Sequence, residues 1–463
     1  MEQYIDDESI FDDAFNSNIK FEKCNDTEVK VNGKNIPEAV KQFVSIKNIP
    51  KILLSNIRKK KFMRPTPIQK YSIPIILSGR DLMATAQTGS GKTIAFILPI
   101  IQKLIIDPVT LVKDRNHCEP QVIIIVPTRE LAVQMKMTIT KLTRNTGIFS
   151  FACYGGIKAT YQKSQILRGC HILVATIGRL NSFVQNGVIT FSSVRILVLN
   201  EVDRMLYDDM KSKIDCILNH FTMPPVMNRQ TIMMSATLPD KTQHLAQFYL
   251  KKDYLLLAVG IVSSTSINIK QTFYLVNKFE KRDMLTTILK KDSAGTIVFV
   301  KRKWVVDYLV TYLNKNNIPS VALHGNHLQH HRKIALSNFH DKKTNVLVAT
   351  DLASRGLDFK CVNHVINFDM PPRIEEYVQR IGRKGKPETQ AISTSFFDPN
   401  EDHSLVVPLI KTLALANQEI PNWLVKLRHD ANYNDANDVL DQFVGLYISH
   451  KPILDNSNDD YEE

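Results

Sequence analysis

Residues 86–93 read AQTGSGKT, and this stretch decides how the rest of the chain is interpreted. It follows the apolar run DLMATA and precedes TIAFILPIIQKLI, which has the pattern of a helix. Glycines let the backbone curl so that successive N–H groups face an anion, and the helix that begins here adds the positive end of its dipole. A glycine-rich turn without a ligand is the alternative, but the strand before and the helix after disfavour it. The motif therefore predicts a nucleoside triphosphate site with bound Mg²⁺, in which Lys92 reaches the β- and γ-phosphates and the Thr93 hydroxyl ligates the metal.

The positive charge of the chain lies in its central part. The net charge is +13 over 463 residues, yet residues 1–15 hold six acidic residues and residues 452–463 hold five, and neither end contains Lys or Arg. Without these ends, residues 16–451 carry +24. A basic body indicates a polyanionic partner such as nucleic acid, although a charge excess that only keeps the protein soluble remains the alternative.

Cysteine usage and hydropathy indicate a soluble intracellular protein. The six cysteines are scattered without a C-x-x-C pair, so neither a disulfide framework nor a zinc site is expected. The histidines of HLQHHR (327–332) have no carboxylate or Cys at a metal-like spacing, and no metal site is expected there. The acidic N-terminus does not resemble a targeting signal, and Pro99, Gln102 and Lys103 interrupt the longest apolar segment. We expect no membrane partner.

Short apolar runs alternate with helical patterns in two blocks. Runs that are apolar on both faces, separated by helical segments, predict parallel sheets covered by helices, so the fold class is α/β with two tandem domains. The predicted strands are 81–85, 122–127, 171–176, 195–200 and 231–235 in the first block, and 296–300, 320–324, 345–350, 364–368 and 392–397 in the second. The expected division is an acidic flexible segment 1–40, a first domain 41–258, a linker 259–267, a second domain 268–428 and an acidic flexible tail 429–463.

Short polar motifs follow several of these predicted strands. Open parallel sheets bind their ligands at these carboxyl ends of the strands. Each motif alone is weak, and their order along the chain carries the weight. They are PTRELA (127–132), TIGR (176–179), NEVD (200–203), SAT (235–237), TDLASRGLD (350–358) and YVQRIGRKGK (377–386).

Together these motifs resemble the DEAD-box RNA helicase family from about Phe43 to Phe397, and the segments 258–282, 395–400 and 420–424 look most like its Vasa branch. The resemblance implies a P-loop NTPase of superfamily 2, with two RecA-like domains that close over ATP and single-stranded RNA. It implies that Gln69 reads the adenine edge, that Phe43 stacks on the ring and that Asp358 lies near the ribose.

The resemblance also assigns roles by position. The implied ATP-binding residues are Phe43, Gln69, Thr88, Gly89, Ser90, Gly91, Lys92, Thr93 and Asp358. The implied RNA-binding residues, which hold phosphates and ribose hydroxyls with little regard to sequence, are Arg129, Gly155, Gly156, Thr176, Arg179, Gln329, Arg332, Thr350 and Gly356. The residues expected to couple the two sites are Asp203, Ser235, Thr237, Gln379 and Arg380. The catalytic set is Lys92, Glu201, Arg383 and Lys386, and Thr93 and Asn200 hold Mg²⁺, the latter through water.

The sequence departs from the family pattern in two catalytic motifs. Asn200 stands where the family has the first Asp of D-E-A-D, which keeps an oxygen but removes a charge close to the metal. Gln379 replaces a histidine, and Lys386 replaces the second arginine finger and loses its planar fork. Since an arginine finger can contribute roughly 10³–10⁵ in rate, slow hydrolysis is expected.

Two functions therefore remain open at this point. The first is an ATP-dependent RNA helicase that remodels RNA or RNA–protein complexes by ATP hydrolysis. The second is an ATP-gated RNA clamp or scaffold with little or no hydrolysis. The Vasa resemblance implies a cytoplasmic protein, with ribonucleoprotein granules or the nucleus as further locations and germ-granule proteins as partners.

Overall fold

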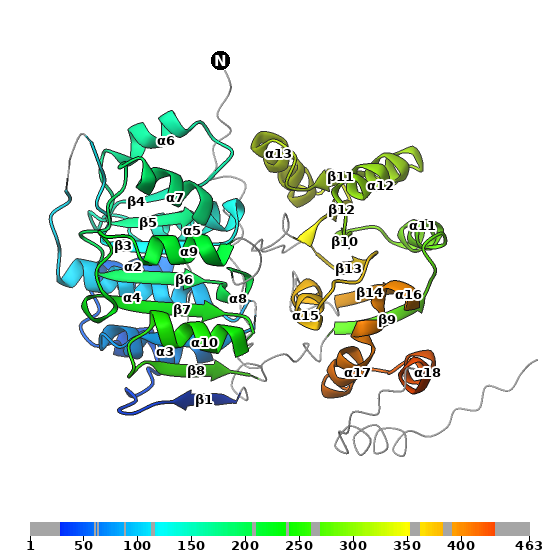
Figure 1. The fold of residues 1–463 in the computed structure, drawn as a ribbon, viewed down its shortest axis with the longest axis horizontal. Helices are drawn as coiled ribbons and strands as arrows, with labels where there is room; N and C mark the ends of the chain where they lie inside the picture. Colours follow the sequence, from blue (N-terminus) through cyan, green and yellow to red (C-terminus); the bar gives the residue numbers. More distant parts are fainter. Residues whose placement is uncertain are drawn as a thin grey trace, which may run out of the picture.

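Two α/β domains lie side by side in the computed structural model (Figure 1). The structure describes residues 28–59, 62, 64–87, 89–112, 116–205, 210–237, 240–260, 269–351, 362–382 and 391–430. Each domain has its own sheet, and helices lie on both faces of each sheet. The predicted tandem α/β organisation is confirmed.

The first domain contains an eight-stranded sheet in the order β1-β8-β2-β7-β6-β3-β5-β4. Its strands are β1 (Val29–Asn32), β2 (Leu82–Ala86), β3 (Val122–Val126), β4 (Ser150–Cys153), β5 (Ile172–Thr176), β6 (Ile196–Asn200), β7 (Gln230–Ser235) and β8 (Leu255–Val259). Its helical segments are η3 (Phe43–Ser45), α2 (Lys51–Lys59), α3 (Pro67–Leu77), α4 (Lys92–Ile106), α5 (Arg129–Leu142), α6 (Ala159–Ile166), α7 (Ile177–Gln185), α8 (Val202–Met205), α9 (Met210–Leu218), η4 (Val226–Asn228) and α10 (Asp240–Tyr249).

The edge strand β1 corrects one expectation. It pairs antiparallel with β8, with Val29 opposite Val259, whereas all the other pairs of this sheet are parallel. Part of the segment 1–40, which we expected to be flexible, therefore belongs to the first sheet. The isolated run VKVN is too short to be recognised without the strand that it pairs with.

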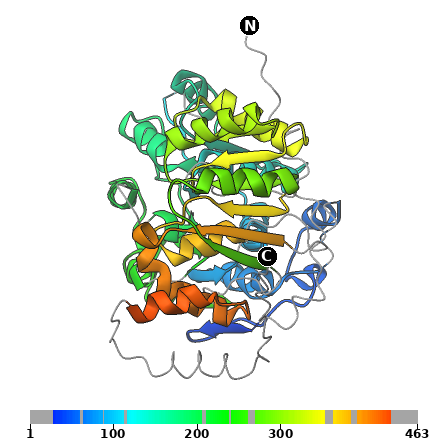
Figure 2. The same cartoon turned by 90° about the vertical axis from the view of Figure 1, so that its right-hand side faces the viewer.

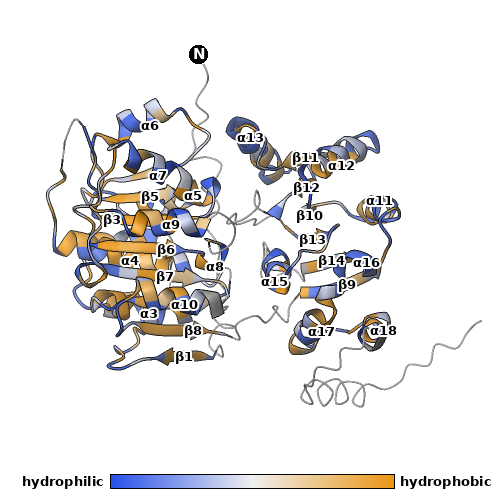
Figure 3. Ribbon diagram, in the orientation of Figure 1, coloured by the Kyte–Doolittle hydropathy of each residue, from blue (hydrophilic) through white to orange (hydrophobic). Residues whose placement is uncertain are grey.

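Apolar side chains fill the space on both faces of the first sheet. Strands β2, β3, β5, β6 and β7 are buried along their whole length, as expected of parallel strands covered on both sides. Helices α2 to α5 contribute to the core on one face, and α6, α7, α9 and α10 contribute to the core on the other. Figure 3 shows these strands as apolar ribbons between helices of mixed character.

The second domain contains a six-stranded parallel sheet in the order β11-β12-β10-β13-β14-β9. Its strands are β9 (Ile269–Leu275), β10 (Thr296–Phe299), β11 (Ser320–Leu323), β12 (Val346–Ala349), β13 (His364–Asn367) and β14 (Ala391–Phe397). Its helical segments are α11 (Lys281–Lys291), α12 (Lys303–Lys315), α13 (Gln329–His340), α15 (Ile374–Ile381), α16 (Pro399–Asp402), η5 (His403–Leu405), α17 (Val406–Leu415) and α18 (Asn422–Asp430). Figure 2 views the molecule with this domain in front.

All ten strands predicted from the sequence are present, with ends that differ by at most one residue. Strands β1, β4, β8 and β9 were not predicted from the sequence. Three of these four lie at an edge of a sheet, and the residues of β9 alternate between buried and exposed, so β9 lacks the apolar run of a central strand. Within the described ranges, no helix is long and apolar enough to cross a membrane.

The parallel order brings the ends of distant strands together. Strands β2, β3, β5, β6 and β7 are parallel, so their carboxyl ends lie on the same side of the first sheet. This side faces the second domain (Figure 1). The motifs that follow these strands therefore meet between the two domains.

Candidate nucleotide and RNA sites between the domains

The loop between β2 and α4 has the backbone of a phosphate-binding loop. Gly89 and Gly91 have φ angles of +80° and +92°, a region that favours glycine, and α4 begins at Lys92. A Cβ atom on Gly91 would lie 2.5 Å from Nε2 of Gln69, so a side chain at this position would displace the Gln69 amide. The turn and the helix start predicted from AQTGSGKT are thus present.

The Lys92 ammonium group is directed back at its own loop. It donates to the carbonyl of Ala86 and, at 3.3 Å, to that of Gln87. Desolvation lowers the pKa of Lys92 to about 8, against the opposing effect of the Asp203 and Glu201 carboxylates. A phosphate group placed here would stabilise the protonated form of Lys92, which burial disfavours.

Three other residues of the expected nucleotide site lie close to this loop or to the segment before it. The Ser90 hydroxyl is buried and has no hydrogen-bond partner among the described residues, so it is available to a ligand oxygen. Gln69 joins the loop to the segment before it: its Oε1 accepts from the Thr66 N–H at 3.1 Å, and its Nε2 donates to the Gly91 carbonyl at 3.1 Å. Phe43, expected to stack on adenine, is 4% exposed and packs in the first-domain core.

The NEVD motif lies at the end of β6, next to the phosphate loop. Asn200 is the last residue of the strand and is buried. Glu201 has φ of +60°, a conformation that a residue with a side chain adopts only under local constraint and that is often found at functional sites. Its Oε2 lies 3.1 Å from Nη1 of the buried Arg204. The turn after β6 thus places the Glu201 carboxylate, on a backbone with positive φ, close enough to Lys92 to affect its pKa.

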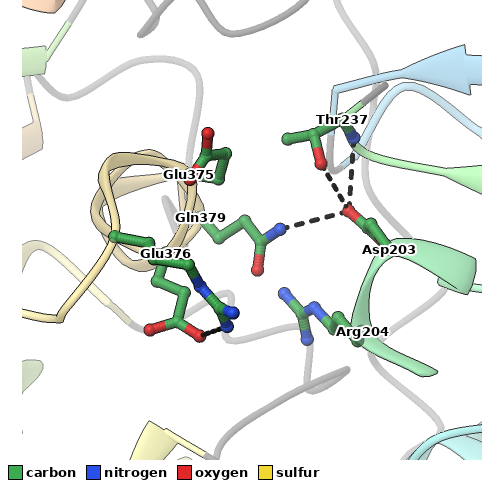
Figure 4. A pocket seen from close by; sticks show the side chains of 7 residues that line it. Asp203, Arg204, Thr237, Glu375, Glu376 and Gln379 are labelled. Atoms are coloured by element: carbon green, nitrogen blue, oxygen red, sulfur yellow. Dashed lines mark hydrogen bonds and ion pairs between the residues drawn. The ribbon is translucent and has the colours of Figure 1, made fainter. Parts of the chain in front are cut away.

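Asp203 connects the two domains. Its Oδ2 accepts from the backbone N–H and hydroxyl of Thr237, at 3.2 and 3.0 Å, and from Nε2 of Gln379 at 3.2 Å. Figure 4 shows Gln379 reaching across from α15 toward this carboxylate. The expected contact with Ser235 is absent here: the buried Ser235 hydroxyl has no hydrogen-bond partner among the described residues. Asp203 therefore joins the NEVD and SAT motifs to the second domain.

A pocket surrounds this contact. It is lined by residues of both domains, with α15 on one side and the loops after β6 and β7 on the other (Figure 4). Its lining residues are Asp203, Arg204, Thr237, Arg373, Glu375, Glu376 and Gln379. Nearby, Arg380 donates through Nε to Asp351 at 2.6 Å and through Nη1 to Asn367 at 3.1 Å, so this expected coupling residue is held within the second domain.

A second contact joins α5 to α13 at the expected RNA face. Nη1 of Arg129 donates to Oε1 of Gln329 at 3.4 Å, and Nε2 of Gln329 donates to Oε1 of Glu130 at 3.2 Å. Nη2 of Arg332 lies 2.8 Å from the same Glu130 oxygen, and both side chains of this ion pair are at most 6% exposed. Burial lowers the pKa of Arg332, and Glu130 opposes that shift.

Gly155 and Gly156 lie against this cluster. A Cβ atom on Gly155 would lie 3.2 Å from Nη2 of Arg129, and one on Gly156 would lie 2.5 Å from its Nη1. Gly156 also has φ of +87°. The absence of side chains at both positions therefore leaves the space that the Arg129 guanidinium occupies beside Gln329 of the other domain.

The remaining expected RNA residues are not part of that cluster. Arg179 lies on α7 and donates to Gln162 and to the Ile157 carbonyl, both at 2.9 Å. Thr176 and Thr350 are mostly buried at the ends of β5 and β12. The expected residues Thr88, Gly356, Asp358, Arg383 and Lys386 lie outside the described residues.

Sequence reasoning missed three residues that hold the site together. Across the domains, Glu130 accepts a hydrogen bond from Gln329 and forms an ion pair with Arg332. Arg204 forms an ion pair with Glu201, and Asp351 accepts a hydrogen bond from Arg380. Each of the three lies inside or directly beside a motif quoted above, so its position in the sequence could have marked it as a candidate site residue. Their partners come from distant segments, which motif spelling does not reveal.

The fold and these contacts define a two-domain P-loop protein whose nucleotide loop and basic side chains meet at the domain interface. A model of the DEAD/DEAH box helicase domain matches residues 66–245, and one of the helicase conserved C-terminal domain matches residues 280–388, which together span more than half of the chain. The chain belongs to the DEAD-box helicase family.

Known relatives agree with this assignment. The ATP-dependent RNA helicase vasa of Drosophila melanogaster is 44% identical over 415 residues, which cover 90% of this chain and 62% of that protein. The probable ATP-dependent RNA helicase DDX4 of Homo sapiens is 42% identical over 427 residues, covering 91% and 58%. The chain thus spans about three fifths of the length of these relatives.

A solved structure supports the fold. S. cerevisiae Dbp5 bound to RNA and ADP BeF3 matches with a TM-score of 0.69 at 22% identity, covering 88% of this chain and all of that one. At this identity the likeness concerns the fold alone.

Proposed function

We propose that this chain is an ATP-dependent RNA helicase that binds single-stranded RNA with little sequence preference and remodels RNA or RNA–protein complexes. The observation that carries the proposal is the convergence of two sets of residues on one interface. The phosphate loop, the NEVD motif and Arg129 all follow strands at the carboxyl ends of the first sheet. Asp203 of the NEVD motif contacts Gln379 of the second domain, and Arg129 contacts Gln329. The names of the vasa and DDX4 relatives support the same activity.

The roles of the nucleotide-site residues follow from their chemistry. Lys92 and the loop amides bind the β- and γ-phosphates, Ser90 offers a further donor, and Glu201 orients the attacking water. Thr93 and, through water, Asn200 would hold Mg²⁺, which would neutralise negative charge at the phosphates. Arg383 and Lys386, beyond the described residues, are the proposed cationic fingers of the second domain.

Asp203 is the proposed link between nucleotide state and RNA. It follows Glu201 by two residues and binds both Thr237 and Gln379, so a shift of the NEVD turn changes a contact between the domains. Arg129 and Gln329 pair with each other in the structure, and RNA phosphates would replace part of that pairing.

A second candidate function is an ATP-gated clamp that holds RNA but hydrolyses little. The replacement of a metal-site carboxylate by Asn200 favours it, since a neutral amide interacts less strongly with a divalent cation. Lys386 favours it too, since an ammonium group does not grip phosphate bidentately. The proposed partners in ribonucleoprotein or germ granules rest on the Vasa resemblance, and coprecipitation from germ cells would test them. The proposed cytoplasmic location rests on the same resemblance.

ATP turnover by the purified chain, with and without single-stranded RNA, separates the two functions. For the helicase we expect RNA-stimulated turnover that a Glu201→Gln variant loses. We also expect Asn200→Asp to raise turnover, most clearly at low Mg²⁺, because it restores a charge beside the metal. No turnover in the wild type, combined with ATP-dependent RNA retention, would instead establish the clamp. Turnover that Glu201→Gln leaves intact would contradict the assignment of the site.

A further inference from the structure

Two histidines and one aspartate of the second domain come together away from the interface site. Asp307 lies on α12, whereas His324 and His327 lie in the loop between β11 and α13. One ligand atom from each of the three lies within 4.8 Å of the others. No spacing in the sequence predicts this cluster, because the carboxylate is 17 residues before the first histidine and reaches it only through the packing of α12 against β11.

The distances within the cluster resemble those of a metal site. Nε2 of His324 lies 3.0 Å from Oδ1 of Asp307, and Nε2 of His327 lies 3.3 Å from the same oxygen. Ligand atoms about 2.0–2.2 Å from a tetrahedral zinc ion lie roughly 3.3–3.6 Å apart, so a small outward movement of the side chains would admit the ion. The rings of the two histidines are already adjacent, with centroids 3.8 Å apart.

The surroundings hold the ligands and leave one side open. The side chain of His324 is 4% exposed, that of His327 is 28% exposed and that of Asp307 is 54% exposed. Lys303, one turn before Asp307, directs its ammonium group to Asn326 at 2.9 Å.

We propose that Asp307, His324 and His327 bind a divalent transition-metal ion, with zinc as the expected occupant. Two imidazoles and one carboxylate suit zinc and its neighbours in the first transition row, whereas Mg²⁺ and Ca²⁺ prefer sites made of oxygen atoms. Water from the exposed side of Asp307 completes the coordination. The bound ion ties the β11–α13 loop to α12, directly before Gln329, whose side chain contacts Glu130 of the first domain.

Calorimetric titration of the tag-free full chain with ZnCl₂ tests the proposal. We expect one binding event that His327→Ala weakens by more than about 100-fold, beyond the range for loss of an outer-shell partner. Asp307→Asn should weaken it too. The matched control carries His330→Ala and His331→Ala, which remove two exposed histidines a few residues away, and it should bind as the wild type does.

Two further readouts keep the test decisive. Co²⁺ in place of zinc should give visible d–d bands without the near-ultraviolet charge-transfer band of a thiolate ligand, and His327→Ala should lose them. Circular dichroism confirms that each variant is folded. Equal zinc affinity in the wild type and folded His327→Ala, or no binding by the wild type, would overturn the proposal, as would a thiolate band for the strongest site.

Discussion

Lys92 shows how the charge of one residue depends on its surroundings. A lysine in water remains protonated up to a pH near 10.4, but desolvation in the phosphate loop lowers the pKa of Lys92 to about 8. The protonated form is the one that attracts a phosphate. Nucleotide binding would therefore favour the protonated form, which burial disfavours.

This charge makes nucleotide affinity dependent on pH. Bound phosphate favours the protonated lysine, so its pKa is higher in the complex than in the free protein, and binding takes up a proton above pH 8. We expect ATP affinity to be nearly constant below pH 8 and to fall above it by up to about tenfold per pH unit. Titrations at pH 7, 8 and 9 measure this. Lys92→Arg stays charged throughout and should show a much flatter profile, and identical profiles would contradict the assignment.

At the scale of elements, α5 and α13 hold the domains together through one buried ion pair. Glu130 and Arg332 are 2.8 Å apart, and Gln329 adds a hydrogen bond to the same carboxylate oxygen. Removing one partner of a buried pair leaves an uncompensated charge, which typically costs about 3–5 kcal/mol. This cost falls on the contact between the domains because each partner comes from a different domain.

We expect Arg332→Gln to open the chain in the absence of RNA and nucleotide. Energy transfer between dyes placed one on each domain should fall, because the Glu130 carboxylate then gains more from water than from the interface. Glu130→Gln should act in the same direction, and the double variant should cost less than the sum of the two. Lys211→Gln breaks an exposed pair within α9 and should leave the signal unchanged. Equal signals in all variants would show that other contacts set the domain spacing.

At the scale of the whole molecule, the basic body would supply the long-range attraction to the proposed RNA partner. Residues 16–451 carry +24, and guanidinium groups of Arg129, Arg179 and Arg332 come from both domains. Contacts of this kind release counterions from the phosphates when they form. Affinity for a single strand then falls with salt at a slope of about −0.7 per neutralised phosphate.

We expect RNA affinity to fall steeply with salt and to vary little with sequence. Arg179→Gln should reduce the slope of log affinity against log salt by roughly 0.7. Arg195 precedes β6 at the opposite edge of the first sheet, so Arg195→Gln should leave the slope nearly unchanged. Filter binding of two unrelated single strands between low and physiological salt measures both quantities. A shallow slope, or a strong preference for one strand, would contradict a phosphate-based interface.

The two parallel sheets and the turn of the proposed phosphate-binding loop follow from local patterns of residues. Central strands such as β3 and β6 are continuous apolar runs because both of their faces are buried, and such runs are visible without a structure. The turn at Gly89 and Gly91 is likewise local, since φ of those residues and the helix after them depend on adjacent residues.

The tertiary structure decided what lies together across long separations. The order of the strands brings Thr237 to Asp203 and α15 to both, and α13 brings Arg332 to Glu130. It also added β1 to the first sheet and brought Asp307 to His324 and His327. Each of these contacts joins segments that have no local tendency to meet. They form only because packing of the two cores fixes the positions of the elements. No periodicity or motif in the sequence encodes the distance between such segments.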